Sequence, residues 1–365
     1  MTDKMTVAIA AGGTAGHINP ALALAEELRD RGHHVVFVGQ SRKLEGRLGP
    51  EAGFDFVPIT VTGFDRSRPW TALTSLWRVN KAKRALASHF SKVGKPDAAI
   101  GFGAYVEVPL LGWCKGAGVP YLLHEQNSVP GLANKMMNSH AARVCISVPA
   151  ARSVFEREGD PDHVLMTGNP VRRSVIEGDR ARGRKALGVP EDATLLLVFG
   201  GSLGAQHLNE RVASLKNELL SRKNLYVLHS TGADGFEETE RALALTPEEA
   251  KRYRVQPYID NMGDMVLSRS GASSVAEIAA LAVPSVLVPY PHATADHQTT
   301  NARYLVDAGA GVLCADADID GFAFADELLH LVDDAAARDA MRQAARGLAQ
   351  DRAAALLADA GEGLR

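Results

Sequence analysis

Cysteine is scarce in this sequence, and its spacing excludes two classes of protein. The 365 residues include three cysteines, Cys114, Cys145 and Cys314. They lie far apart, their number is odd, and no C-x-x-C pair occurs. A disulfide framework or a thiolate zinc site needs closely paired cysteines, so both are excluded. The pattern is typical of a protein from a reducing cytoplasm.

A long hydrophobic run and an excess of one charge are also lacking. The longest apolar stretch, residues 278–291, is too short to span a bilayer and contains Pro284 and Pro289. No apolar leader precedes the first strand-like segment, so we expect neither a signal peptide nor a membrane span. Forty basic residues against 43 acidic ones give a net charge of −3. We therefore expect no nucleic acid partner.

Short apolar runs alternate with helical patterns along nearly the whole chain. At about 150 residues per domain, the length indicates two domains. Regular strand–helix alternation is typical of an α/β fold in which helices cover both faces of a parallel sheet. The runs expected to be buried strands are residues 6–11, 35–38, 98–101, 121–123, 195–199, 226–229, 265–267, 285–288 and 311–314.

The same strand-to-helix turn occurs twice, as GGTAG at residues 12–16 and as GGSLG at residues 200–204. A second α/β unit therefore restarts near residue 195, and Gly168-Asn169-Pro170 is the expected hinge. We predict two Rossmann-like, doubly wound domains that face a cleft. The expected bounds are residues 1–167 and 168–350, followed by a helical segment at 351–365.

The first glycine loop has the character of an anion-binding turn. Glycines allow backbone N–H groups to approach an oxyanion, and the dipole of the following helix, expected to begin near Pro20, adds positive charge. His17 beside this helix end is biased toward its neutral form, which can accept a proton from a sugar hydroxyl. A purely structural role for His17 as a cap or turn residue remains open.

Two common nucleotide motifs are absent from these turns. A dinucleotide fingerprint requires G-x-G-x-x-G and an acidic residue about 20 positions later, whereas the second expected strand ends in Val38-Gly39-Gln40. NAD and FAD are therefore disfavoured. The phosphate-loop pattern G-x-x-x-x-G-K-[S/T] does not occur either.

The second half of the chain contains several groups suited to a nucleoside diphosphate. Ser202 adds a hydroxyl donor to the second glycine loop. Glu277, expected in the first turn of the helix after RSGASS, either complements the helix dipole or accepts hydrogen bonds from ribose hydroxyls. His292 and His297 lack a third ligand at regular spacing, which disfavours a metal site. The D-x-D sequence at residues 316–318 is interpreted as a helix cap.

Two further groups of residues have an open interpretation. GFGAY at residues 101–105 and HEQN at residues 124–127 each follow an expected strand, where they form either simple turns or substrate contacts. Residues 66–84 combine tryptophans and leucines with a cluster of Arg and Lys. This stretch is either core packing or an interfacial patch for anionic lipid.

Taken together, the motifs resemble one family closely. GGTAGHINP, GFGAY, HEQN, GNPVR, GGSLGAQHLN, YIDNM, RSGASSVAEI and ADHQTTNA occur in this order over residues 12–302. This arrangement is similar to that of the bacterial peptidoglycan glycosyltransferases that act on lipid I, which is undecaprenyl-pyrophosphoryl-MurNAc-pentapeptide. The resemblance implies transfer of N-acetylglucosamine from UDP-GlcNAc to lipid I, giving lipid II.

The resemblance also implies a B-type glycosyltransferase fold, with an N-terminal acceptor domain, a C-terminal donor domain and a last helix that packs on the first domain. It implies an inverting reaction without metal or cofactor, on the cytoplasmic face of the membrane as a peripheral protein. The patch at 66–84 matches the family in character and would contact the anionic membrane surface. The two alternatives are a glycosyltransferase acting on diacylglycerol and a non-catalytic UDP-sugar sensor.

Site residues follow from the resemblance position by position. His17 would be the general base or would position the acceptor diphosphate, with Glu125 as the weaker candidate. Ile259 would hold uracil, Glu277 the ribose and Gln298 the sugar. Ala15 stands where many members have glycine, which shifts the first loop slightly. The substrate-binding residues implied in this way are Thr14, Ala15, Gly16, Asn127, Arg172, Ser202, Ile259, Ala272, Ser273, Ser274, Val275, Ala276, Glu277 and Gln298.

Overall fold

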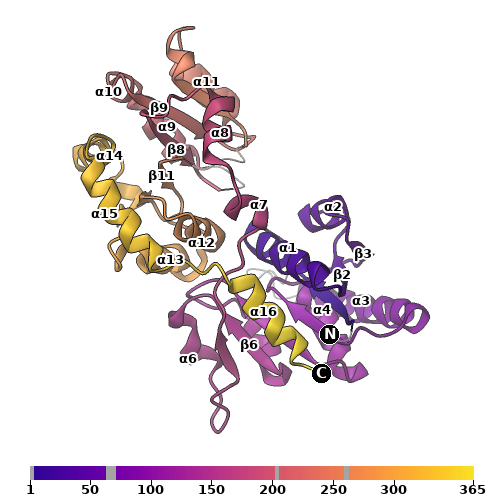
Figure 1. The fold of residues 1–365 in the computed structure, drawn as a ribbon. Helices are drawn as coiled ribbons and strands as arrows, with labels where there is room; N and C mark the ends of the chain where they lie inside the picture. The colour runs from indigo at the N-terminus through magenta and orange to yellow at the C-terminus, as the bar shows by residue number, and fades with distance from the viewer. Residues whose placement is uncertain (1–3, 63–70, 202–204, 259–262) are drawn as a thin grey trace. The chain divides into compact units, whose positions relative to one another are not determined.

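The computed structural model describes residues 4–62, 71–201, 205–258 and 263–365. The chain forms two compact units, residues 1–172 together with 350–365 (unit 1) and residues 173–349 (unit 2). Each unit is an open parallel sheet with helices on both faces (Figure 1). The predicted doubly wound α/β class is confirmed.

The described residues of unit 1 contain a seven-stranded sheet in the order β3-β2-β1-β4-β5-β6-β7. Every neighbouring pair is parallel. The chain builds strands outward from β1 on one side, then crosses to β4 and builds outward on the other. The strands are β1 (Thr6–Ala10), β2 (His34–Gly39), β3 (Asp55–Pro58), β4 (Ala98–Gly101), β5 (Tyr121–Glu125), β6 (Arg143–Ile146) and β7 (Val164–Met166).

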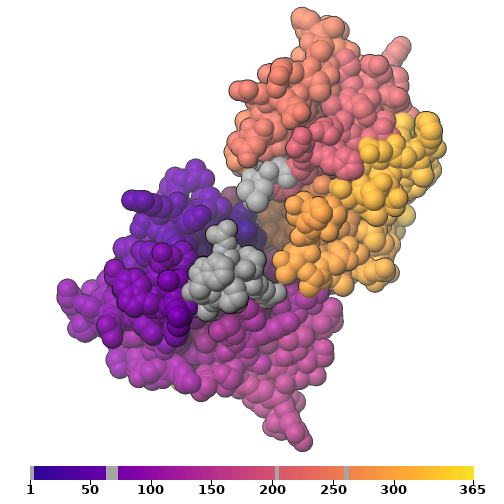
Figure 2. All heavy atoms as spheres, turned by 180° about the vertical axis from the view of Figure 1, so that it is seen from behind, coloured from indigo at the N-terminus to yellow at the C-terminus, as the bar shows by residue number. Residues whose placement is uncertain are grey.

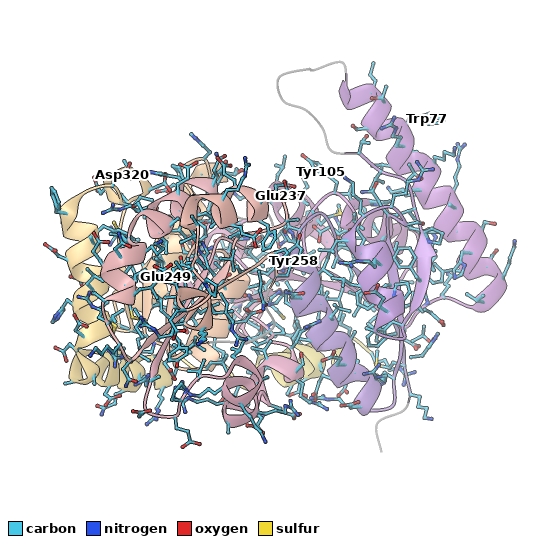
Figure 3. All side chains as sticks on the ribbon, turned by 90° about the horizontal axis from the view of Figure 1, so that it is seen from above. Trp77, Tyr105, Glu237, Glu249, Tyr258 and Asp320 are labelled. Atoms are coloured by element: carbon cyan, nitrogen blue, oxygen red, sulfur yellow. The ribbon has the colours of Figure 1, made fainter. Side chains whose placement is uncertain are left out.

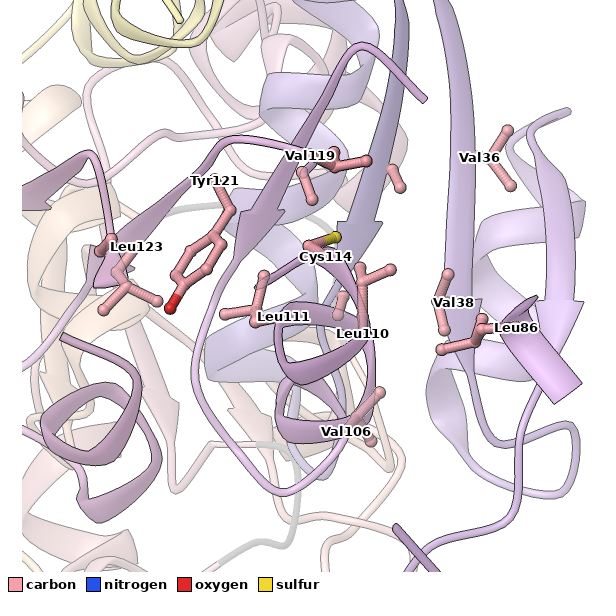
Figure 4. Close-up of a cluster of buried hydrophobic side chains, with 14 of the residues drawn as sticks. Val36, Val38, Leu86, Val106, Leu110, Leu111, Cys114, Val119, Tyr121 and Leu123 are labelled. Carbon is pink, nitrogen blue, oxygen red and sulfur yellow. The ribbon is translucent and has the colours of Figure 1, made fainter. Parts of the chain in front are cut away.

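Alternate residues of each strand in unit 1 enter two separate hydrophobic cores. Ala8 and Ala10 of β1 lie in the core beneath α3 and α4, which Figure 4 shows in part. Val7 and Ile9 lie in the core beneath α1 and α16. This period of two is what a strand buried on both faces produces. The helices are α1 (Ala15–Asp30), α2 (Leu44–Glu51), α3 (Thr71–Val93), α4 (Glu107–Ala117), α5 (Leu132–Met137), α6 (Arg152–Phe155) and α16 (Ala353–Glu362).

The C-terminal helix α16 belongs to unit 1, where it packs against α1 and β4. Arg31, which follows α1, donates to Asp359 at 2.6 Å and to Glu362 at 3.2 Å. His33 lies 2.8 Å from the same Glu362 carboxylate. Leu357 and Ala358 of α16 are fully buried. These contacts fix the last helix to the first sheet although more than 300 residues separate them in the chain.

The described residues of unit 2 contain a six-stranded parallel sheet in the order β10-β9-β8-β11-β12-β13. Leu196 and Val198 of β8 face a core that α14 covers, and Leu195 and Leu197 face a core that α12 and α13 cover. The strands are β8 (Thr194–Phe199), β9 (Leu225–Ser230), β10 (Tyr253–Gln256), β11 (Met265–Ser268), β12 (Ser285–Leu287) and β13 (Gly311–Leu313). The helices are α7 (Arg173–Ile176), α8 (Arg180–Leu187), α9 (Gln206–Ser214), α10 (Lys216–Leu220), α11 (Phe236–Leu243), α12 (Ala272–Ala280), α13 (His297–Val306), α14 (Phe322–Asp333) and α15 (Ala335–Arg346).

All nine expected strands are present, but four others, of three or four residues each, were not foreseen. Three of these, β3, β7 and β10, lie at sheet edges, where one side of the strand needs no apolar cover. The fourth unforeseen strand, β6, is internal and begins at Arg143.

The tight turn between α6 and β7, which pairs Arg157 with Asp160, projects from the rest of unit 1 (Figures 1 and 2).

Two expected helix starts are wrong. Helix α1 begins at Ala15 and includes Pro20, so His17 lies within its first turn rather than before the helix. Pro20 has no N–H to donate to the carbonyl four residues earlier, but the helix continues because its remaining face packs in the core. Helix α12 begins at Ala272, which places Glu277 in the second turn and not the first.

Candidate functional site

The strand order of each unit reverses at one point, and the predicted glycine loops flank it. In unit 1 the reversal lies between β1 and β4, which lead into the loops that begin at Gly12 and Phe102. In unit 2 it lies between β8 and β11, which lead into the loops that begin at Gly200 and Arg269. The two loops at such a reversal diverge from each other, because the helices that follow them cover opposite faces of the sheet. Each unit therefore has a ligand-binding position at the carboxyl edge of its sheet.

The first glycine loop of unit 1 places His17 at the N-terminus of α1. Thr14 precedes the helix in extended conformation and makes no side-chain cap hydrogen bond. Its Oγ1 instead lies 3.0 Å from His17 Nδ1. A proton on Nδ1, donated to this hydroxyl, leaves the lone pair of the imidazole on Nε2. In this tautomer, Nε2 is the ring nitrogen that can accept a proton.

The second loop of unit 1 packs against the other side of that histidine. A Cβ atom added to Gly103 would lie 3.2 Å from His17 Cδ2 and 3.4 Å from His17 Nε2. Gly103 also has a φ of +84°, a conformation that side chains disfavour. The adjoining Tyr105 is exposed (Figure 3). The GFGAY loop is therefore more than a turn, because its backbone at Gly103 lies beside the His17 ring.

The HEQN segment mainly supports the loops from below. His124, Glu125 and Gln126 are buried, and only Asn127 is half-exposed. The Glu125 carboxylate accepts hydrogen bonds from the Asn127 N–H at 3.0 Å and the Gly131 N–H at 2.9 Å. It also accepts one from Asn134 Nδ2 at 2.9 Å. The Glu125 carboxylate is thus engaged by groups of its own unit, and His17 stays the leading candidate base.

His124 is held in its neutral form. Burial lowers the pKa of His124 to about 4, although its hydrogen bond to the Gly168 carbonyl opposes this. Its Nε2 lies 2.9 Å from that carbonyl, and its Nδ1 accepts from Gln126 Nε2 at 3.0 Å. The Phe102 ring lies against the imidazole, with centroids 5.1 Å apart. His124 therefore links the end of β5 to the second loop without carrying charge at neutral pH.

Sequence reasoning placed Arg172 with the donor-binding domain, whereas the structure makes it the last residue of unit 1. Its side chain is half-buried. Asn134, which sequence reasoning missed, is buried and donates to both the His124 carbonyl and Glu125. The signal that could have found it is its place in helix α5, directly after the Pro130-Gly131 turn.

In unit 2 the second glycine loop leads to α9, and Ser202 itself lies outside the described residues. Gly201 has a φ of +88° and is exposed. Asn209 of α9 is buried and donates to the Thr231 carbonyl at 3.0 Å. Its Oδ1 lies 3.0 Å from Nε2 of the buried His229. This network fixes the helix that follows the loop. Ile259, the residue expected to hold uracil, also lies outside the described residues.

The N-terminus of α12 carries five of the expected donor-binding residues. Its N-cap residue is Gly271, which has no side chain to cap the helix. Ala272, Ser273 and Ser274 form the first turn and are half-exposed. The Val275 side chain is buried in the core, so only its backbone is suited to a ligand contact. A helix end of this kind favours a phosphate through its N–H groups and dipole.

Gln298, at the start of α13, is fixed by two backbone contacts. Its Oε1 accepts from the Tyr290 N–H at 2.9 Å, and its own carbonyl accepts from Ser270 Oγ at 2.9 Å. The side-chain amide is thereby oriented, with its oxygen on the protein and its N–H groups directed elsewhere. An amide held in this way is suited to donate to a sugar hydroxyl or carbonyl.

A charged cluster beside these loops was not foreseen. Arg269, at the end of β11, is buried and lies 2.5 Å from Asp316 Oδ1. It donates to the Pro289 carbonyl at 3.0 Å. Asp316 Oδ2 lies 2.9 Å from His207 Nδ1 on α9. The D-x-D segment therefore joins the two loops of unit 2 through ion pairs, and its interpretation as a cap is wrong, because Ala315 is the N-cap residue.

This cluster predicts a pH-dependent stability. The hydrogen bond that His207 donates to the Asp316 carboxylate raises the pKa of His207, and the carboxylate of Asp320 raises it further. A histidine whose pKa is raised by folding stabilises the folded state fully at a pH below its ordinary pKa of about 6.5. This stabilisation is lost as the pH rises through the pKa of the folded state. We expect His207→Gln to lower the melting temperature by about 2 °C at pH 5.5, since the pair is partly exposed, and by less at pH 9. Equal differences at both pH values would contradict this, and His330→Gln on α14 is the exposed control.

The described part of the 66–84 stretch has both buried and exposed side chains, with Ala82 in the core beneath α3 and α4. Leu73, Leu76 and Trp77 on α3 are exposed by 75%, 58% and 63% (Figure 3). Lys81 Nζ lies 5.4 Å from the centre of the Trp77 ring. The core-packing interpretation is therefore wrong for these three side chains, while residues 66–70 lie outside the described residues. No helix in the described ranges is long and apolar enough to span a bilayer.

Within the described ranges, no group of three or more His, Cys, Asp or Glu side chains is arranged to hold a metal ion. His297 Nδ1 is occupied by the Thr294 carbonyl at 2.8 Å. His292 is exposed beside Tyr290, with ring centroids 5.6 Å apart. The two histidines thus have separate local contacts.

Comparison with known proteins agrees with this arrangement. Residues 7–146 match the glycosyltransferase family 28 N-terminal domain, and residues 195–357 match the glycosyltransferase family 28 C-terminal domain. The chain is similar to the UDP-N-acetylglucosamine–N-acetylmuramyl-(pentapeptide) pyrophosphoryl-undecaprenol N-acetylglucosamine transferases of Desulforudis audaxviator and Halothermothrix orenii. The first is 36% identical over 99% of this chain and 100% of the relative. The second is 34% identical over 94% of each.

A solved structure supports the same assignment. The crystal structure of Acinetobacter baumannii MurG is 27% identical, covers 98% of this chain and 99% of its own, and has a TM-score of 0.73. The calicheamicin glycosyltransferase CalG4, at 16% identity and a TM-score of 0.67, shares the fold alone. On its two matched domains and its identity to these relatives, the chain belongs to glycosyltransferase family 28, among the N-acetylglucosamine transferases of the MurG type.

Proposed function

We propose that this protein transfers N-acetylglucosamine from UDP-GlcNAc to lipid I and so forms lipid II for peptidoglycan. The observation that carries the proposal is the pairing of glycine loops at the strand reversal of each unit, with His17 in the first turn of α1. The relatives named above have the same activity in their names and match over nearly the whole chain. Of the family's motifs, only GGSLG and YIDNM include residues outside the described ranges.

Unit 2 is suited to the donor. The uncapped N-terminus of α12 would bind the diphosphate, and Glu277 on its second turn would accept hydrogen bonds from the ribose hydroxyls. Gln298, with its Oε1 already engaged by the Tyr290 N–H, would donate to the sugar. Ser202, Ile259 and Arg172 would complete the donor contacts, as the resemblance implies.

Unit 1 is suited to the acceptor. His17 Nε2 would accept the proton of the attacking sugar hydroxyl as that oxygen forms a bond to the anomeric carbon. The bond from this carbon to the UDP oxygen breaks on the opposite side, so the configuration inverts. Positive helix ends would stabilise the charge on the departing diphosphate, which is why we expect no need for a metal ion. Thr14, Ala15, Gly16 and Asn127 would bind substrate, the first three as the loop that the resemblance makes donor-contacting.

The deciding experiment measures UDP release from UDP-GlcNAc by the wild-type chain. We expect release only when a lipid I analogue is present, with the disaccharide product found by mass spectrometry, and the same rate in EDTA. Release with diacylglycerol in place of the analogue would favour the first alternative. UDP-GlcNAc binding without turnover of any acceptor would favour the second, a sensor.

We also propose that α3 attaches the protein to an anionic membrane surface, on the cytoplasmic face where its lipid acceptor lies. Leu73, Leu76 and Trp77 are exposed on a helix that also carries Arg78 and Lys81. Apolar side chains among cations bind an interface rich in acidic lipid without crossing it.

The attachment predicts a loss of vesicle binding. We expect Leu73→Ser combined with Trp77→Ser to reduce partition onto vesicles containing phosphatidylglycerol by about tenfold or more, because two apolar side chains no longer enter the interface. Co-sedimentation measures this. Phe322→Ser, on α14 and 89% exposed, is the control. Unchanged partition of the double variant would show that another surface binds.

A further inference from the structure

A buried carboxyl group lies under the second loop of unit 1, outside the residues that the family resemblance supplied. Glu107 is the first residue of α4 and is 0% exposed. Its Oε2 accepts the Gly103 N–H at 2.6 Å. Its Oε1 is also buried and has no hydrogen-bond partner among the described residues. Such a group is costly to bury, which directs attention to what it holds in place.

Glu107 closes a loop of unfavourable backbone conformation. Gly103 and Ala104 both have positive φ angles, +84° and +65°, and the second is disfavoured for a residue with a side chain. The Glu107 N–H donates to the Ala104 carbonyl at 3.4 Å while its carboxyl binds the Gly103 N–H. A Cβ at Gly101 would lie 2.5 Å from Glu107 Oε2, so the carboxyl fills the space that this glycine leaves.

The loop held in this way contacts the candidate base. The Cα side of Gly103 lies against the His17 ring, with Cδ2 and Nε2 at 3.2 Å and 3.4 Å from the position of an added Cβ. An added Cβ at Gly13 would lie 3.7 Å from the Ala104 Cβ, so the two glycine loops lie next to each other. A shift of the Gly103 peptide would therefore move the backbone that limits rotation of the His17 ring.

We propose that Glu107 is a positioning residue for glycosyl transfer: by binding the Gly103 N–H, its carboxyl holds the Gly103 peptide against His17 and fixes the ring for proton transfer. Glu107 does not touch substrate, and its effect passes through the loop. This inference rests on the proposed function for its kinetic consequences, but the position of the His17 ring is measurable without substrate.

The protonation of Glu107 gives the proposal a distinct signature. Burial raises the pKa of Glu107 to about 8; the Gly103 N–H opposes this rise, and the charge of Glu125 adds to it. Burial raises the pKa of Tyr121 on β5 to about 12, and the charge of Glu107 adds to this rise, so Tyr121 stays neutral. His17 lies across the Gly103 peptide. The folded state favours protonated Glu107. The stability of the fold therefore decreases as the pH rises from the ordinary pKa of a glutamic acid to about 8, the pKa of Glu107 in the folded state.

The experiment compares Glu107→Gln, Glu107→Ala and Leu110→Val in the full-length protein. Leu110 is buried on the same helix and controls for a general loss of packing. Gln keeps a neutral group of the same shape whose oxygen accepts the Gly103 N–H, whereas Ala removes the acceptor. We expect Glu107→Ala to lower kcat about tenfold or more with an unchanged KM for UDP-GlcNAc, because a buried donor loses its partner. Glu107→Gln should remain within about threefold of wild type at pH 7.

Two readouts separate positioning from simple stability. The kcat of the wild type should fall above pH 8, and this alkaline limb should be absent in Glu107→Gln. The NMR signals of the His17 imidazole, recorded without substrate, should shift in Glu107→Ala and stay near wild type in Glu107→Gln and Leu110→Val.

Several outcomes would overturn the proposal. Unchanged kcat in folded Glu107→Ala, an equal loss in Leu110→Val, or an alkaline limb retained in Glu107→Gln would each do so. Should Glu107→Ala not fold, the pH profile of Glu107→Gln decides. If the wild type transfers no sugar, the proposed function fails, while unchanged His17 signals in Glu107→Ala would contradict the positioning role itself.

Discussion

Replacing His17 by Ala is expected to reduce kcat by about 10² to 10⁴-fold, the range that a positioned general base contributes. The ring lies in the first turn of α1, with Nδ1 3.0 Å from Thr14 Oγ1 and its edge against Gly103. The weaker candidate, Glu125, already accepts hydrogen bonds from Asn127, Gly131 and Asn134. Single-turnover transfer to a lipid I analogue measures the effect.

The affinity for UDP should stay the same in this variant, because His17 itself is not among the expected donor contacts. Calorimetry with UDP checks that point. His34→Ala is a matched control, because His34 starts β2 at the amino edge of the same sheet and pairs with Asp55 at the surface. If His17→Ala retained the wild-type rate, the proton would have another acceptor and the proposed role of His17 would be wrong.

Replacing Glu277 by Ala is expected to weaken UDP binding about 100-fold. Two hydrogen bonds to a charged acceptor contribute about 1.5–3 kcal/mol each, and 1.4 kcal/mol corresponds to a factor of ten in affinity. Glu277 is half-exposed on the second turn of α12, one turn beyond the residues proposed to bind the diphosphate. Isothermal titration with UDP gives the change directly.

The same variant can be tested against the ligand group that it is proposed to bind. With 2′-deoxy-UDP, the difference between wild type and Glu277→Ala should shrink, since one of the two hydrogen bonds is already absent. Glu237→Ala on α11 is the control, because it removes an exposed glutamate from the same unit (Figure 3). Additive losses from the variant and the deoxy ligand would show that Glu277 does not bind the 2′-hydroxyl.

The sequence indicated the fold because its strands are buried on both faces and therefore appear as apolar runs. Segments such as β1 and β8 satisfy this condition, and each is followed by a glycine loop that marks the strand end. Edge strands such as β3 need apolar residues on only part of their surface and escaped the same criterion. The start of α1 was placed late because proline was taken to open the helix, although packing allows Pro20 inside it.

The candidate site was predictable where a residue acts through its place in a motif, as for His17, Gln298 and the N-terminus of α12. The supporting contacts were not. The sequence pattern does not show that Glu125 binds Gly131 and Asn134. It also does not show that Asp316 pairs with Arg269 and His207. Nor does it show that Glu107 binds the Gly103 N–H beside His17. The sequence leaves HEQN open between a turn and substrate contacts, whereas the structure buries three of its four side chains.

By itself, the sequence determined the α/β class, the two-domain organisation and the positions of the glycine loops, because periodicity and turn chemistry act over a few residues. Only the tertiary structure decided which loops meet at a strand reversal, which carboxylates hold a loop and which can meet a ligand. Those properties depend on burial and on pairing between distant segments. A carboxylate such as Glu107 or Glu125 acquires its role from the backbone N–H groups that folding places beside it.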